Sequence, residues 1–314
     1  MTESHGAKTS NRTVPDVVVV GAASRDRTAE DPRGWRLGGG VTYGALTTAR
    51  LGLRTAALIG VDGEAAAAEE LGLLRAAGCE VALARLARGP VFENIEATGG
   101  RSQVAFERSD LVPVEALPPA WAGAPGWILT PVAAELDDSW ANAMRAEAIV
   151  AVGWQGLLRE LAAGEPVGRH RPGPSPLLAR ADLVGLSHDD VEPDVTLDDL
   201  CRLVRPGATL VLTQGDQGGI VMEGGDRARN LRRYPAVPSH RPTDPTGAGD
   251  AFLASLLAAR TQPKLVGGRI GQGFDLLLAA AVASLVAEGP GLSGVPDRSA
   301  VRRRMSEGLA RHGR

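Results

Sequence analysis

The stretch "TDPTGAGDAFLASLLAAR" (residues 243–260) joins a turn that contains proline to a strongly helical run. Apolar residues such as Phe252 and Leu256 recur in this run at one-turn spacing, which predicts a helix with one buried face. Gly247 and Gly249 therefore fall at a helix start, where a glycine costs about 1 kcal/mol relative to alanine. The cost implies that these glycines serve another purpose.

A helix N-terminus can bind an anion. Its first backbone N–H groups are unpaired and carry partial positive charge, and glycine lets an anion come close to them. Gly247, Ala248 and Gly249 therefore predict an anion cradle. Asp250, in the same turn, can act as a general base on a substrate hydroxyl while the amides hold a transferring phosphoryl group. The alternative is that Asp250 is a first-turn acidic residue favoured by the helix dipole.

The rest of the chain reads as alternating strands and helices. Its 314 residues are 44% hydrophobic and 23% charged, a globular balance that can fill a sizeable core. Continuous apolar runs predict buried strands at 16–24, 54–60, 126–130, 148–153, 181–187 and 208–215. Helical patterns lie between them at 41–51, 64–77, 155–162 and 196–204. This alternation predicts an α/β fold with a mostly parallel central sheet between helices.

Some segments depart from this pattern. Residues 90–107 hold two strand-like runs joined by "TGG", a hairpin that forms either a small lid or an extra edge of the main sheet. The Pro- and Gly-rich stretch 164–176 predicts an exposed connector. We expect a disordered tail at 1–14, a main domain over 15–298, and a basic helix or tail at 299–314.

Composition narrows the function. The net charge of -3 gives no indication of nucleic acid or anionic membrane as a partner. The only lysines are Lys8 and Lys264, so backbone amides or arginines would have to bind phosphate. Cys79 and Cys201 are typical of reduced thiols, and with no signal peptide or spanning run in the sequence we expect a cytoplasmic protein.

The string D-P-T-G-A-G-D-A-F (244–252) resembles the C-terminal signature of the ribokinase (PfkB-type) sugar kinase family. The resemblance extends over roughly residues 15–296. It implies a ribokinase-like three-layer αβα sandwich with a mostly parallel central sheet and a small β lid. It also implies ATP-dependent phosphorylation of a hydroxyl on a sugar or cyclic polyol, with Asp250 as base and Mg²⁺ bridging the phosphates.

The resemblance also implies where the acceptor substrate binds. "GAASRD" ends in the family's substrate-binding aspartate, and "LGGGVTYGALTTARLG" (37–52) resembles its paired-glycine signature. Tyr43 stands where many relatives have Asn, and together with "FENIEATGGRSQ" it resembles the branch that includes myo-inositol kinases. The implied substrate-binding residues are Asp26, Gly38, Gly39, Tyr43, Asn94, Arg101 and Gln155.

On the nucleotide side, "LTQGDQGG" (212–219) resembles the family's T-x-G-x-x-G segment, in which Thr213, Gly215 and Gly218 border the ATP phosphates and ribose. The family's N-x-x-E motif corresponds to residues 187–190, where Asn has become Ser187 and Glu has become Asp190. Asp190 would still order the hydrated magnesium ion, unless the motif has decayed.

Two further pairs complete the expected site. Asp244 and Thr246 match positions that bind a monovalent cation such as K⁺ in several family members, although an aspartate before proline also suits a plain turn. Ala280 and Ala283, in a helical run over 274–288, would line the adenine pocket.

Two alternatives stay open at this stage. The first is a nucleoside kinase of the same family, whose flat base would stack on Phe92, Phe106 or Tyr43. The second is a catalytically silent sugar- or nucleotide-binding homologue, suggested by Ser187 and Asp190. In every case the expected ligands are small molecules, and exposed lid strands could pair across a homodimer.

Overall fold

The computed structural model describes residues 14–97, 100–225, 228–267, 269 and 273–312. The expected tail at 1–14 lies almost wholly outside these residues. None of the helices described is long and apolar enough to cross a membrane.

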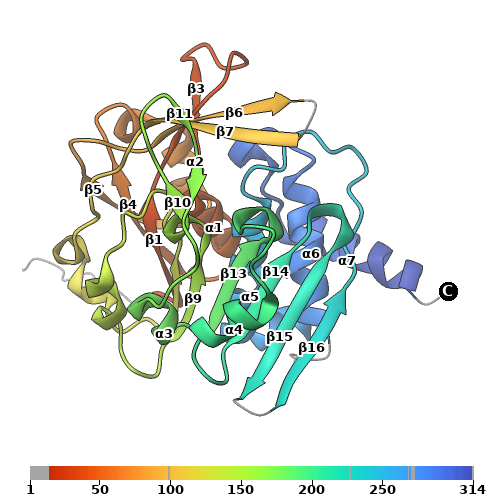
Figure 1. Ribbon diagram of the computed structural model, residues 1–314. Helices are drawn as coiled ribbons and strands as arrows, with labels where there is room; N and C mark the ends of the chain where they lie inside the picture. Colours follow the sequence, from red (N-terminus) through yellow and green to blue (C-terminus); the bar gives the residue numbers. More distant parts are fainter. Residues whose placement is uncertain (1–13, 98–99, 226–227, 268, 270–272, 313–314) are drawn as a thin grey trace, which may run out of the picture.

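A nine-stranded sheet forms the centre of the molecule (Figure 1). Parallel pairing joins its strands from β14 to β5, and antiparallel pairing adds β15 and β16 at one edge. In spatial order the strands are β16 (Ala228–Tyr234), β15 (Gly219–Gly225), β14 (Thr209–Thr213), β13 (Leu183–Ser187), β9 (Ile149–Gly153), β8 (Gly126–Leu129), β1 (Val17–Ala22), β4 (Thr55–Val61) and β5 (Glu80–Arg85). All six predicted strand runs are present.

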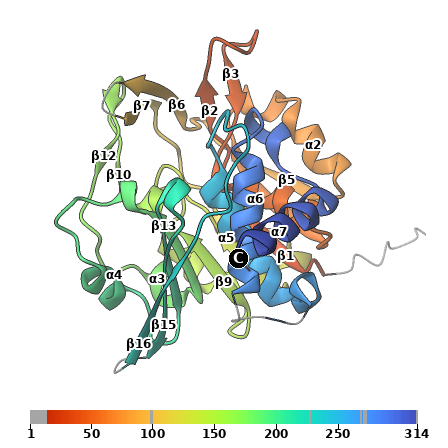
Figure 2. The same cartoon turned by 90° about the vertical axis from the view of Figure 1, so that its right-hand side faces the viewer.

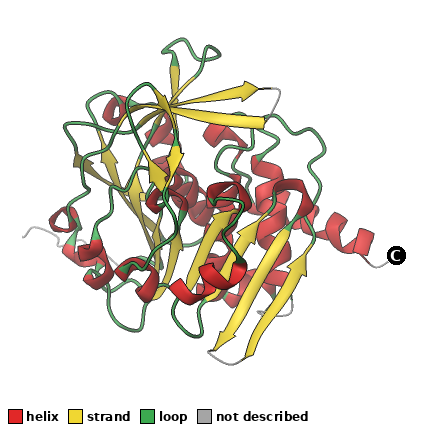
Figure 3. Ribbon diagram, in the orientation of Figure 1, coloured by secondary structure: helices red, strands yellow, loops and turns green. Residues whose placement is uncertain are grey.

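Helices cover both faces of this sheet (Figures 1 and 3). Valines of β1 alternate between two apolar cores, because successive side chains of a strand point to opposite faces. One core lies under α1 (Gly40–Arg50), α2 (Glu70–Ala76), α5 (Ala248–Thr261), α6 (Phe274–Val286) and α7 (Arg298–His312). The other lies under α3 (Pro176–Arg180) and α4 (Leu197–Leu203). This arrangement confirms the predicted three-layer α/β fold.

Helix α5 lies in the middle of its layer. It packs against α1 and α6 and against strands β8, β9 and β13. Residues 251–259 are all buried, so the helix is covered on every side rather than on the one face that the apolar spacing predicts. Its alanines and Ser255 face neighbouring elements where a solvent-facing helix would carry charges.

The predicted hairpin belongs to a separate lid sheet rather than to the main sheet (Figures 1 and 2). The order of the lid strands is β11 (Glu165–Pro166), β7 (Gly100–Glu107), β6 (Val91–Ala97), β2 (Arg25–Arg27) and β3 (Trp35–Leu37). The expected exposed connector at 164–176 therefore supplies one short lid strand.

The predicted helix over 155–162 is wrong. The chain makes one 3₁₀ turn at Gln155–Leu157 and continues as β10 (Arg159–Glu160), which pairs with β12 (Gly168–Arg169). Leu158 packs in the core under α3 and α4, whereas Leu161 packs in a separate small core with Phe92 of the lid. The chain must be extended here because these two leucines serve different cores.

Helix α7 resolves the choice between a basic helix and a tail at the C-terminal end. Val301 and Arg304 are buried, and the helix packs against α6. Arg304 donates hydrogen bonds to Ser284 Oγ and to both carboxylate oxygens of Glu288, at 2.9 Å each for the latter. The terminal helix is thus part of the folded domain.

Candidate active site

Two carboxylates meet at the start of α1. A Cβ added at Gly38 would collide with the carboxylate of Asp26, and one added at Gly40 would lie 2.5 Å from Oδ1 of Asp250. Only glycine leaves room for both acids at this helix N-terminus, where the helix dipole favours negative charge. Asp26 Oδ1 also accepts a hydrogen bond from Ser24 Oγ at 2.7 Å.

The predicted anion cradle lies at the start of α5. Gly247 is its N-cap residue, with φ of 78°, and no heavy atom lies within 4 Å of a Cβ built on Gly249. The N–H of Ala248 donates to the carbonyl of Pro245 at 3.1 Å, so this amide closes the preceding turn. The open space beside Gly249 is what an anion at this terminus requires.

The ring of Tyr43 packs against the first residue of the anion cradle, Gly247. Its side chain is only 2% exposed, and a Cβ at Gly247 would overlap its ring. The family resemblance predicts that Tyr43 binds the substrate, and this contact with the substrate stays a prediction. In the structure the ring packs against Gly247 and holds the start of α5 in position.

The carboxyl group of Asp250 has an unusual pKa. As a residue Asp250 keeps some exposure to solvent. Burial of its carboxyl group is nevertheless the largest influence and raises the pKa to about 6, with Asp190 and Asp26 also raising it. Arg159 acts in the opposite direction. A carboxyl group with this pKa can hold a proton and release it near neutral pH.

Arg159 was not expected from the sequence. Its Nη1 donates to the carbonyl of Val132 at 2.9 Å, and its guanidinium carbon lies 5.0 Å from the ring centroid of Phe92. Burial lowers the pKa of Arg159, whereas the nearby carboxylates of Asp190, Asp250, Asp26 and Glu135 raise it.

Glu135 is a second buried ionisable residue that was not expected from the sequence. It is 0% exposed, and its carboxylate accepts N–H groups from Ala22 at 2.8 Å, Val132 at 3.0 Å and Ala133 at 2.8 Å. Burial raises its pKa. These bonds fix the loop after β8, so the Val132 carbonyl that receives Arg159 has a defined position.

Asp190 has well-defined partners. Its Oδ1 accepts from Gln155 Nε2 at 2.8 Å and its Oδ2 from the N–H of Ser187 at 2.8 Å. Ser187 Oγ in turn accepts from the N–H of Asp189 at 3.2 Å, which completes a capping box. The altered residues 187–190 therefore keep an ordered geometry, and Gln155 contributes to it.

Thr213 ends β14, and Gly215 and Gly218 lie in the turn that follows it. Space around Gly215 is open, whereas a Cβ at Gly218 would meet the carbonyl of Tyr234. Beside this contact lies a cavity of about 260 Å³, whose apolar lining includes Tyr234, Val237, Phe274 and Leu277. Ala280 is buried and Ala283 partly buried, and both lie further along α6 than the residues that line the cavity.

The predicted cation-binding pair forms a turn. Asp244 Oδ1 accepts from the N–H of Thr246 at 3.0 Å and from its hydroxyl at 2.6 Å. On the lid, Asn94 Oδ1 accepts from Gln103 Nε2 at 2.9 Å. Arg101 lies opposite Glu96 in the hairpin register, but its side chain is outside the described part of the structure.

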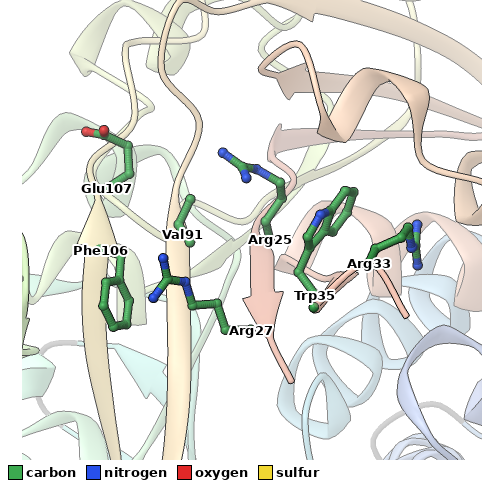
Figure 4. Close-up of a pocket in the computed structure, with 8 residues that line it drawn as sticks. Arg25, Arg27, Arg33, Trp35, Val91, Phe106 and Glu107 are labelled. Carbon is green, nitrogen blue, oxygen red and sulfur yellow. The ribbon is translucent and has the colours of Figure 1, made fainter. Parts of the chain in front are cut away.

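A separate cavity of about 370 Å³ lies on the lid (Figure 4). Arg25 and Arg27 line it, together with Trp35 and Phe106, and Arg27 lies over the Phe106 ring at 3.7 Å. These arginines flank Asp26 in β2, so they lie on the opposite face of the strand from it. This cavity is therefore distinct from the site formed by Asp26, Asp190 and Asp250, which we call the acid cluster.

The chain is similar to known proteins in part of its sequence and in its fold. The pfkB family carbohydrate kinase model matches residues 179–298, which include Asp190, the Gly215–Gly218 turn and α5. A pyrophosphate-dependent kinase in the ribokinase family, solved with a pyrophosphate analog and myo-inositol, superimposes with a TM-score of 0.71 at 19% identity, over 91% of this chain and 99% of that chain. The chain has the ribokinase fold.

Other solved structures agree. Arabidopsis thaliana ribokinase, complexed with ribose and ATP, has a TM-score of 0.62 at 17% identity, over 93% of this chain and 99% of its own. A Methanocaldococcus jannaschii nucleoside kinase has a TM-score of 0.63 at 16% identity, over 94% of this chain and 99% of its own. No curated protein matches the sequence. The resemblance to the PfkB family and the fold class that it implies are thus confirmed.

Within this ribokinase fold, six of the predicted residues lie around Asp26, Asp190 and Asp250 and come from three places. Asp26, Gly38 and Gly39 come from the lid base and the start of α1, Asp250 from α5, and Gln155 with Asp190 from the ends of β9 and β13. The missed residues are Gly40, Glu135 and Arg159. Gly40 was signalled by the third glycine of "GGG", but the other two carry no local signal.

Proposed function

We propose that this protein is an ATP-dependent kinase that phosphorylates a hydroxyl of a sugar or cyclic polyol. The observation that carries the proposal is the position of Asp250. Its carboxyl group lies beside Asp26 and belongs to the first turn of α5, where backbone N–H groups remain for an anion. A base and an anion site in one helical turn suit proton removal coupled to phosphoryl transfer.

In the proposed reaction, Asp26 accepts a hydrogen bond from one hydroxyl of the acceptor and Asp250 takes the proton of the attacked hydroxyl. The oxygen so freed attacks the terminal phosphorus of ATP, the bond to the bridging oxygen breaks, and ADP leaves. The N–H groups of Gly247, Gly249 and Asp250 would hold the transferring phosphoryl oxygens. No covalent phosphoenzyme is required.

The aromatic residues support a polyol rather than a nucleoside as acceptor. Phe92 is 1% exposed and carries Arg159 over its ring, while Phe106 carries Arg27 and faces the other side of the lid. Tyr43 is buried against Gly247. Phe92 and Tyr43 are therefore covered, Phe106 lines the separate lid cavity, and Asp26 and Asp250 are groups that bind hydroxyls.

The donor side supports ATP. The lining of the cavity next to Gly218 includes Arg232 and Arg233 but is mostly apolar. Its apolar side chains suit a flat, weakly polar adenine ring, and they include Tyr234, Val237, Phe274 and Leu277. The α6 residues that line this cavity lie nearer the N-terminal end of the helix than Ala280 and Ala283 do. We therefore assign adenine to the Phe274 end of this helix.

The residues present fit a hydrated magnesium ion. No group of three or more His, Cys, Asp or Glu side chains in the described part of the chain could hold a metal alone. Each oxygen of Asp190 receives one hydrogen bond and keeps a second lone pair for a metal-bound water. Magnesium would supply positive charge at the donor phosphates, and Asp244 with Thr246 would accommodate K⁺ beside the cradle.

A transfer assay tests the proposal. The protein is incubated with ATP and Mg²⁺ and with myo-inositol, ribose, fructose, 2-keto-3-deoxygluconate or nucleosides, and ³¹P NMR identifies the phosphorylated product. We expect acceptor-dependent ADP formation with at least one neutral sugar or polyol, reduced about 100-fold or more in Asp250→Asn. ADP formation that ignores every acceptor would contradict a carbohydrate kinase.

A parallel series replaces ATP with pyrophosphate, because the similar structure solved with myo-inositol is named as pyrophosphate-dependent. Transfer from pyrophosphate but not from ATP would keep the kinase and overturn the nucleotide donor.

A further inference from the structure

Arg159 supplies the positive charge of the acid cluster. Among the charged groups that act on Asp250, Asp190 and Asp26 are negative and Arg159 is positive. The same carboxylates, with Glu135, act on Arg159 in return. A phosphoryl group entering among these acids would be repelled unless a cation stands beside them.

The guanidinium is held in place from two directions. The main body supplies the Val132 carbonyl, and the lid supplies the Phe92 ring. Phe92 pairs with Asp26 in the parallel register of β6 and β2, so Arg159 reaches the lid beside the predicted acceptor-binding acid. Glu135 orders the loop that carries Val132. An arginine fixed in this way loses little freedom when it binds a ligand.

The hydrogen-bonding capacity of Arg159 also exceeds what the described residues use. A guanidinium has five N–H donors in a planar fork, and the bond to the Val132 carbonyl takes one of them. Phosphoryl oxygens are ligands that suit this fork.

We propose that Arg159 is a catalytic residue that donates hydrogen bonds to the phosphoryl group as it passes to the acceptor. The inference rests on the proposed function. As the acceptor oxygen bonds to phosphorus and the bond to the leaving ADP oxygen breaks, Asp250 keeps the acceptor proton and Arg159 offsets the negative charge on the transferring oxygens. A second effect follows, because the positive charge of Arg159 lowers the pKa of Asp250 and keeps the base ionised.

Steady-state kinetics across pH test this role in Arg159→Gln, Arg159→Lys and Arg169→Gln. Arg169 pairs directly with Arg159 across β10 and β12 but is exposed, so it is a matched control. For Arg159→Gln we expect kcat to fall about 100-fold or more, and the acidic limb of the pH profile to move to higher pH. Arg159→Lys should keep the limb in place with a partial loss of kcat, and Arg169→Gln should match the unchanged protein.

A variant that does not fold can be distinguished from one that folds but contradicts the role of Arg159. If Arg159→Gln does not fold, Arg159→Lys decides, because undiminished kcat with lysine would overturn the role of the guanidinium. In a folded Arg159→Gln variant, unchanged kcat and an unmoved limb would also overturn it. ¹³C NMR titration of the Asp250 carboxyl, assigned with Asp250→Asn, gives a readout without turnover. Should the unchanged protein transfer no phosphoryl group, the proposed function fails, while a raised Asp250 pKa in Arg159→Gln would still support the electrostatic part.

Discussion

At the scale of single residues, Asp250 combines burial with two acidic neighbours. Its pKa of about 6 lies above the ordinary aspartate value of 3.8, because burial, Asp190 and Asp26 together outweigh Arg159. Asp250 can accept a proton only when its carboxyl group is ionised. Its activity as a base is therefore present above this pKa and is lost as the pH falls through it.

We therefore expect kcat/KM of the proposed kinase to fall about tenfold per pH unit below pH 6, with a plateau above it. The measurement is a pH–rate profile between pH 4.5 and about 8 under conditions in which thermal unfolding shows the protein to be folded. A profile that stays flat down to pH 4.5 would contradict the assignment of Asp250.

The two glycines of the cradle should separate stability from activity. Gly247→Ala places a methyl group into the Tyr43 ring at φ of 78°, so we expect a loss of about 2 kcal/mol or more in unfolding free energy. Gly249→Ala meets open space inside α5, so stability should change by less than about 1 kcal/mol while phosphoryl transfer falls. Urea unfolding and the transfer assay measure both; equal stability of the two variants would be inconsistent with the packing described.

The sequence predicts these residues unevenly. Asp26, Gly38 and Asp250 lie in dense local patterns that resemble a known signature. Arg159 gains its role from a partner 27 positions away, and Glu135 joins its own loop to Ala22, which lies 113 positions away. A lone arginine after "VGWQGLL" looks like a helix surface residue, and only the folded chain brings it under Phe92.

At the scale of elements, six of the nine main-sheet strands were predictable because burial on both faces leaves continuous apolar runs, whereas β5, β15 and β16, toward the two edges of the sheet, were not predicted. The helix expected at 155–162 was wrong because periodicity cannot show that Leu158 and Leu161 enter different cores. The C-terminal element illustrates the opposite case. Its basic composition is typical of a solvated helix, but one of its arginines, Arg304, is buried against α6.

Arg304→Ala should destabilise the protein strongly, because it leaves Glu288 and Ser284 without their main partner. We expect a loss of about 3 kcal/mol in unfolding free energy. Arg303→Ala, at the neighbouring exposed position, should change it by less than about 0.5 kcal/mol. Chemical denaturation compares the two variants, and similar midpoints for both would mean that α7 contributes little to the fold.

At the scale of the whole molecule, the lid is a sheet of its own above the main sheet (Figure 2). Sequence patterns predict its hairpin but not the strands β2, β3 and β11, which have only two or three residues each and depend on pairing partners far along the chain. Ile95 of β6 is 43% exposed on this sheet.

We expect the lid sheets of two chains to associate as a homodimer. Ile95→Glu should then yield a monomer, because a charge cannot be buried there without a partner. Leu73→Glu on α2, an exposed apolar position outside the lid, is the control and should leave the dimer intact. Light scattering after size-exclusion chromatography reports the mass; a monomeric unchanged protein would contradict the expectation.

The burial of α5 on every side has a consequence for motion. The amides that would hold the donor phosphate begin a helix locked among α1, α6 and the central strands, so this half of the site cannot shift without loosening the core. Asp26, in contrast, belongs to a strand of the lid sheet. We therefore expect bound molecules to enter and leave by movement of the lid sheet rather than of α5. A covalent tether from lid to body would slow turnover by retaining product and would leave the bond-making step unaltered.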